Sequence, residues 1–172
     1  MKIIWLGHAS FRLEMGSEVL LIDPWLSGNP MFPDQMMDVA LKGVSHILIT
    51  HGHFDHASEL QQIGQTTGAT LCGIPEVCGP FADGGLPTIE FNKGGTIKLG
   101  DIAVSMVAAS HSSSMKSNGL DVYAGTEAGF MITGEGRTMY VSGDTDIMAD
   151  MDWMGDFYKP EIGILCAGGH YT

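Results

Sequence analysis

The chain has 172 residues, 44% of them hydrophobic and 16% charged, which predicts one folded domain over residues 1–172 and excludes a disordered protein. Eight Lys and Arg against twenty Asp and Glu give a net charge of −12 and argue against nucleic acid or an anionic membrane as partner, because both are bound through basic patches. We expect a cytoplasmic protein, since no apolar run could span a bilayer, no signal peptide is recognisable and the three cysteines are too few for a disulfide framework.

Short apolar and β-branched runs between Gly-rich turns predict strands, and longer segments that close at a glycine predict helices. The predicted strands are Ile3–Leu6, Phe11–Met15, Val19–Ile22, His46–Ile49, Thr70–Gly73, Thr96–Leu99, Ile102–Ala108, Gly129–Thr133, Thr138–Ser142 and Ile162–Leu165. The predicted helices are Asp34–Lys42, Ala57–Thr67, Pro75–Phe81 and Met148–Phe157. Strands and hairpins with interspersed helices favour a mixed α/β sandwich over a regular βαβ array.

The stretch His51-Gly52-His53-Phe54-Asp55-His56 holds potential metal ligands directly after a predicted strand and before a predicted helix. In an extended loop, residues at i and i+2 point the same way, so His51 and His53 can share one ion. Asp55 and His56 then reach a second ion or the other side of the first. Imidazole and carboxylate without thiolate suit Zn, Mn, Fe or Ni. The sequence therefore predicts a metal site on this strand-to-helix loop.

Two later strands end in further ligands. The strand Ile102–Ala108 leads to His111, and the strand Thr138–Ser142 leads to Gly143 and Asp144. Binding residues on loops that follow the strands of a rigid sheet are the usual way in which a scaffold assembles a site. The combined set supplies three histidines for one ion and an aspartate and a histidine for a second, with one carboxylate free to bridge.

The order His-x-His-x-Asp-His, a lone His and then Ser-Gly-Asp-Thr resembles the metallo-β-lactamase superfamily. The segments Leu6–Phe11, Ile22–Pro24 and Gly168–Thr172 resemble in particular the metal-dependent hydrolases related to ascorbate-6-phosphate lactonase. The resemblance implies a four-layer αββα sandwich with the site along one edge of the paired sheets. It also implies a ligand set: the first ion bound by His51, His53 and His111, the second by Asp55 and His56, and Asp144 bridging.

Members of that family continue beyond the segment that ends here at Thr172 and supply a further histidine to the second ion. We therefore expect a C-terminally shortened fold with a complete first metal site and an incomplete second one. Three explanations stay open: a truncated chain, a partner chain or water in place of the ligand, and a weaker second site. An uncovered strand edge would favour a homo-oligomer.

We expect a metal-dependent hydrolase with two divalent ions, Zn or Mn before Fe or Ni, acting on a small ester, lactone or phosphoester. A bound ion lowers the pKa of water from about 15.7 to about 7, and Asp55 would orient the resulting hydroxide and take up its proton. A non-catalytic or weakly active metal-binding module is one alternative. A di-iron oxidoreductase is another, although the flavin partner domain and additional carboxylate ligands that it would need are not seen.

Four more residues have open roles. His8 either faces the substrate at the mouth of the site or is a hydrogen-bonded core histidine. Asp23, before Pro24, either accepts a hydrogen bond from a ligand histidine or the ligand loop, or ends a strand in a turn. His170 is not predicted to be a ligand. Lys116, in a predicted loop after His111, either contacts an anionic group or is a solvated loop lysine.

Overall fold

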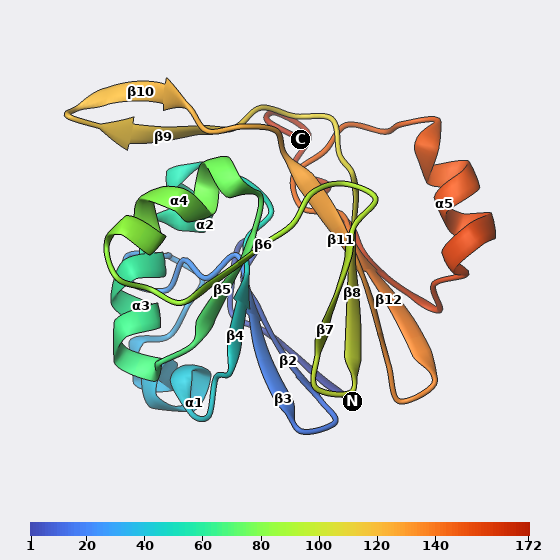
Figure 1. Ribbon diagram of the computed structural model, residues 1–172, viewed down its shortest axis with the longest axis horizontal. Coiled ribbons are helices and arrows are strands. Elements are labelled where there is room, and N and C mark those ends of the chain that lie inside the picture. Colours follow the sequence, from blue (N-terminus) through green and yellow to red (C-terminus); the bar gives the residue numbers. More distant parts are fainter.

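Two β-sheets pack face to face in the computed structural model, which describes residues 1–172, and helices cover their outer faces (Figure 1). This is the four-layer αββα arrangement that the resemblance implied. The first sheet has the order β1-β2-β3-β4-β5-β6 and consists of β1 (Lys2–Trp5), β2 (Phe11–Met15), β3 (Glu18–Ile22), β4 (His46–Leu48), β5 (Thr70–Gly73) and β6 (Thr88–Glu90). Strands β1 to β3 are antiparallel, and β3 to β6 are parallel.

Helices make the crossover connections that parallel strands require. They are the 3-10 helix η1 (Asp34–Met36) and α1 (Met37–Leu41) before β4, α2 (Phe54–Ala57) and α3 (Leu60–Thr67) before β5, and α4 (Pro75–Asp83) before β6. Figure 1 shows α1, α3 and α4 on the outer side of this sheet. This half of the molecule therefore contains βαβ units within the mixed α/β sandwich that the sequence predicted.

The second sheet has the order β13-β12-β11-β8-β7 and is antiparallel except for the parallel pair β12 and β13. Its strands are β7 (Thr96–Leu99), β8 (Ile102–Ala108), β11 (Ala128–Gly134), β12 (Arg137–Val141) and β13 (Ile162–Ile164). Helix α5 (Asp150–Tyr158) connects β12 to β13 and covers the outer face of this sheet (Figure 1). A small cluster of Val107, Met131, Tyr140 and Met154 packs between them.

The main core lies between the sheets and extends beneath the helices of the first sheet. It is a single cluster of 32 buried residues. Leu20, Leu21 and Ile22 of β3 are all fully buried, because this inner strand has helices on one face and the second sheet on the other. Burying one such side chain contributes about 1.5–3 kcal/mol. This rigid core fixes the strand ends from which the ligand loops begin.

The predicted elements are present with ends shifted by a few residues, and three differences have physical causes. The helix predicted over Ala57–Thr67 is two helices, so Asp55 and His56 lie on α2 and not on a loop. The predicted helix Asp34–Lys42 begins as the 3-10 turn η1. The predicted loop Ser112–Asn118 contains a strand, β9 (Ser114–Ser117), which pairs with β10 (Leu120–Tyr123). This pair lacks an alternating apolar pattern because both of its faces are largely exposed.

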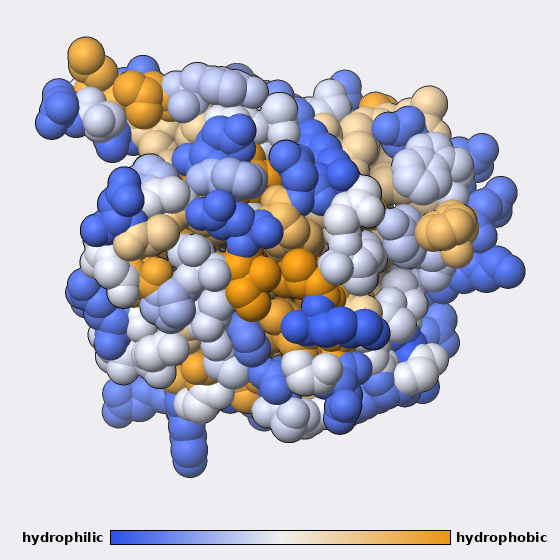
Figure 2. All heavy atoms as spheres, viewed as in Figure 1, coloured by the Kyte–Doolittle hydropathy of each residue, from blue (hydrophilic) through white to orange (hydrophobic).

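The hairpin β9–β10 projects from the body of the molecule (Figure 1) and carries apolar side chains, seen at the upper left of Figure 2. It exposes Leu120, Val122 and Tyr123.

Cys72 and Cys78 are buried in the main core, and burial raises the pKa of each thiol to about 12. None of the helices combines the length and the apolar character needed to cross a bilayer.

Candidate metal centre and active site

Three strand ends meet at the upper edge of the sandwich in Figure 1. His51 follows β4, His111 follows β8 and Asp144 follows β12, so residues from both sheets converge there. A cavity of about 740 Å³ opens at this edge, and His53, Asp55, His111 and Asp144 are among its lining residues. The rigid core below holds these loops in place, which is what a preformed site requires.

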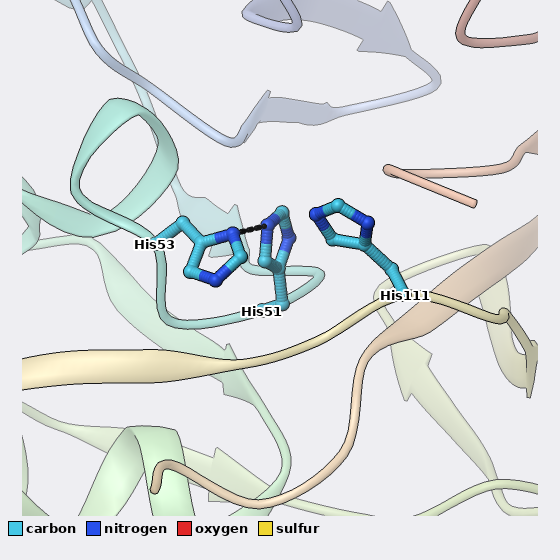
Figure 3. Close-up of side chains that lie close together, drawn as sticks. All are labelled: His51, His53 and His111. Carbon is cyan, nitrogen blue, oxygen red and sulfur yellow. Dashed lines mark hydrogen bonds between the residues drawn. The ribbon is translucent and has the colours of Figure 1, made fainter. Parts of the chain in front are cut away.

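The side chains of His51, His53 and His111 point toward one another (Figure 3). Nε2 of His51 lies 3.0 Å from Nδ1 of His53, and one nitrogen of each of the three rings lies within 4.8 Å of the others. Burial lowers the pKa of His51, and the neighbouring histidines lower it further. Burial and His111 also lower the pKa of His53. Both rings are therefore neutral at pH 7, the state in which an imidazole can bind a metal ion.

Asp23 holds the ligand loop, residues 50–53, through hydrogen bonds to Thr50. Its Oδ1 accepts a hydrogen bond from the backbone N–H of Thr50 at 2.8 Å, and its Oδ2 accepts one from the Thr50 hydroxyl at 2.6 Å. Nδ1 of His56 lies 2.9 Å from the same Oδ2. Thr50 also contacts Nδ1 of His51 at 3.0 Å. Asp23 thus orients two of the predicted ligands, His56 directly and His51 through Thr50, and it does so with a left-handed φ of 46°.

His56 is completely buried, and its Nε2 has no hydrogen-bond partner. The nearest carboxylate oxygen is Oδ2 of Asp144, at 3.5 Å. Burial alone would lower the pKa of His56, but the carboxylates of Asp23 and Asp144 outweigh it and raise the pKa to about 10. A buried polar atom without a partner is costly, so Nε2 is suited to bind a metal ion, which would give it a partner.

Asp144 lies between the two groups of ligands. Its Oδ2 is 3.5 Å from Nε2 of His56 and 3.8 Å from Nε2 of His111. Burial acts to raise the pKa of Asp144, but the interaction with His56 and the charges of the nearby histidines lower it overall. The preceding Gly143 has a φ of +61°, and a Cβ there would lie 2.8 Å from the Ala128 carbonyl oxygen and from Thr50. Only glycine therefore permits this approach of the backbone to the ligand loop.

His8 and Asp55 form the other side of the site. Nε2 of His8 lies 3.3 Å from Oδ2 of Asp55, and a nitrogen of each of His8 and His56 and an oxygen of Asp55 lie within 4.8 Å of one another. His8 is exposed and lines the cavity, so it is not a core histidine. Its ring meets Trp25 edge-on, with centroids 5.3 Å apart. The sequence did not indicate His8 as a potential metal ligand, because it lies more than forty residues before Asp55 and His56 and belongs to no ligand motif with them.

Other polar residues divide into those that support the site and those that lie away from it. Thr50 was not predicted, although a threonine at a strand end directly before a ligand was a visible signal. His46 lies at the opposite end of β4, where its Nδ1 is 3.1 Å from Oε2 of Glu18. His170 lines the cavity near the end of the chain. Lys116 is ion-paired with Asp121 at 2.8 Å on the projecting hairpin and does not line the cavity.

Residues 19–167 match the Beta-lactamase superfamily domain. The chain belongs to the metallo-β-lactamase superfamily. Over its whole length this superfamily member is 56% identical to a UPF0173 metal-dependent hydrolase of Dinoroseobacter shibae and 55% identical to one of Paracoccus denitrificans, and it spans 75% of each. Among solved structures it is similar to Igni18, a metallo hydrolase of the archaeon Ignicoccus hospitalis. The TM-score is 0.87 with 30% identity, over 99% of this chain and 72% of that one.

Within the superfamily fold, the predicted ligands His51, His53, Asp55, His56, His111 and Asp144 are brought to one edge of the sandwich, as are His8 and Asp23. This donor set consists of imidazole and carboxylate groups, which suit divalent transition metals. Cys166 does not belong to this donor set. Its Sγ lies 3.3 Å from the backbone nitrogen and 3.2 Å from the carbonyl oxygen of Thr145. The closer resemblance to ascorbate-6-phosphate lactonase stays a prediction.

Proposed function

We propose that this chain is a metal-dependent hydrolase that cleaves a small ester, lactone or phosphoester with an activated water molecule. The observation that carries the proposal is the group formed by His51, His53 and His111, whose ring nitrogens lie close together at the edge of a large cavity. The relatives from D. shibae and P. denitrificans carry the name metal-dependent hydrolase, which supports the same activity here.

Two divalent ions fit the residues present. His51, His53 and His111 would hold the first ion, because burial keeps His51 and His53 neutral and so leaves nitrogen lone pairs available. Asp55 and His56 would hold the second, since the buried Nε2 of His56 has no other partner. Asp144, between these groups, would bridge. Zn or Mn suits this donor set best, with Fe or Ni as alternatives.

Divalent ions, when bound, lower the pKa of water and polarise the oxygen of a carbonyl or phosphoryl group. The residues of the chain supply the rest of the chemistry. Asp55 orients the attacking water and accepts its proton. Nε2 of His8, at 3.3 Å from Oδ2 of Asp55, is positioned to receive that proton or to donate one to the leaving group. Asp23 keeps the proton of His56 on Nδ1 and so leaves Nε2 as the ligand atom.

The proposal is tested by elemental analysis of the purified protein together with assays on chromogenic esters, lactones and phosphodiesters, with added Zn or Mn. About two equivalents of Zn or Mn and hydrolytic turnover that chelation abolishes are the expected result. One tightly held ion without turnover would instead indicate a non-catalytic metal-binding module. Stoichiometric iron with redox-dependent colour would indicate an oxidoreductase.

A further inference from the structure

Phe54 presents an apolar ring to the cavity between two proposed ligands. It lies between His53 and Asp55 in the sequence, begins α2, lines the cavity and is 65% exposed. Its ring meets Trp25 edge-on with centroids 5.6 Å apart, and Trp25 in turn meets His8 edge-on. An aromatic side chain that is braced from behind yet left open to the cavity is suited to contact a ligand.

Further apolar side chains line the same cavity on the segment that follows β13. Leu165 is 60% exposed, and Tyr171 is also largely exposed. The wall of the cavity also includes the less exposed side chains of Val141 in β12 and Ile164 in β13. Exposed large apolar groups that gather around a cavity are typical of a site for a small and largely apolar molecule.

Two of the three side-chain carboxylates that line the cavity, Asp55 and Asp144, are at the proposed metal positions, and the third, Asp23, holds His56. Neither Lys nor Arg is among the residues that line it. Lys116 is paired with Asp121 on the projecting hairpin. A substrate with a second anionic group would therefore lose hydration in this cavity without gaining a cation in return. The net charge of −12 adds repulsion at longer range.

We propose that the site accepts an uncharged ester or lactone whose apolar part lies against Phe54 and Leu165, and that it discriminates against phosphorylated or carboxylated substrates. This rests on the proposed function and narrows its substrate class. Water adds to the carbonyl carbon, and the bond from that carbon to the alkoxy oxygen breaks. The alcohol leaves with one proton of the water, and the carboxylic acid that forms releases the other. No further reactant is needed.

Binding tests the inference without any turnover. The probes are 4-nitrophenyl hexyl ether and 6-(4-nitrophenoxy)hexanoate, which differ only in a terminal methyl or carboxylate group. Measured with chelator present, so that the carboxylate has no ion to bind, the ether should bind at least about tenfold more tightly. Phe54→Ala should weaken binding of the ether about tenfold. Phe157→Ala is the control, because Phe157 is 73% exposed on α5 and does not line the cavity.

Turnover by the zinc-loaded protein separates this inference from the proposed function. The substrates are 4-nitrophenyl hexanoate and 4-nitrophenyl hydrogen adipate, which again differ in one terminal carboxylate. We expect kcat/KM to be at least about tenfold higher for the hexanoate, and the Phe54→Ala change to act mainly on KM. Equal binding of the two ethers, or better turnover of the adipate, would overturn the inference. Selective binding of the neutral ether without any hydrolysis would overturn only the proposed function.

Discussion

Asp23 and His56 form a buried pair, in which Nδ1 of His56 lies 2.9 Å from Oδ2 of Asp23 and both side chains are almost fully shielded from solvent. Asp23 directly follows β3, and His56 lies on α2, the helix that follows β4. The pair stabilises the fold at the point where the proposed ligands begin. It also decides which nitrogen of His56 faces Asp144.

Replacing Asp23 by Ala should lower the free energy of unfolding by about 3–5 kcal/mol, because it leaves Nδ1 of His56 and the polar groups of Thr50 buried without their partner. Zinc affinity should fall about 10- to 100-fold, since the orientation of His56 is lost. Urea denaturation and zinc titration measure the two effects. Asp121→Asn is the control, and its effect on stability should stay below about 1 kcal/mol because its ion pair is exposed. A stable, fully zinc-binding Asp23→Ala protein would disprove the role of Asp23.

Metal binding should release a proton from His56. The carboxylates of Asp23 and Asp144 overcome the effect of burial and raise the pKa of His56 to about 10, so its ring is protonated in the metal-free protein near neutral pH. An ion bound at Nε2 must displace that proton, and apparent affinity should therefore rise about tenfold per pH unit between pH 6 and 8. Calorimetry in buffers of different ionisation enthalpy measures the released protons. His56→Gln should remove about one of them, and an unchanged number would exclude His56 as a ligand.

His53→Ala should abolish binding of the first ion and any hydrolytic activity. Removal of His53 leaves two of the three imidazoles that would hold this ion. Metal content by elemental analysis and turnover of a chromogenic ester are the measurements. His46→Ala is the matched control, because His46 is at the far end of β4 and contacts Glu18 instead. Full metal content and activity in the His53 variant would refute the proposed site.

Gly143→Ala should be far more disruptive than Gly136→Ala, although both glycines have a positive φ. A Cβ at position 143 would lie 2.8 Å from the Ala128 carbonyl oxygen and from Thr50, whereas at position 136 it would meet nothing within 4 Å. We expect a loss of about 1 kcal/mol for Gly136→Ala, from backbone strain alone, and a loss above about 3 kcal/mol for Gly143→Ala. Thermal and urea denaturation compare the two variants. Equal losses would show that the contact with Thr50 does not limit this position.

The sequence predicted every strand of the two sheets except β6 (Thr88–Glu90), because an apolar run such as Leu20–Ile22 carries a local signal for a buried strand, whereas β6 is short and only partly buried. It missed β9 and β10, since a hairpin that projects into solvent has no buried face to impose alternation on its residues. It also placed Asp55 and His56 on a loop. The helix α2 that carries them has only four residues, which is too short for a helical periodicity to show in the sequence.

For the candidate site, the sequence by itself determined the chemical types of the proposed ligands and the strand ends after which they lie. Spacing of two residues after a strand sufficed to predict that His51 and His53 point together. Only the tertiary structure decided that His8 lies beside Asp55, that Asp23 holds His56 and that Phe54 is open to the cavity. The physical reason is that local propensities and periodicity act over a few neighbouring residues. The relations among distant residues are set by the packing of two sheets around one shared core.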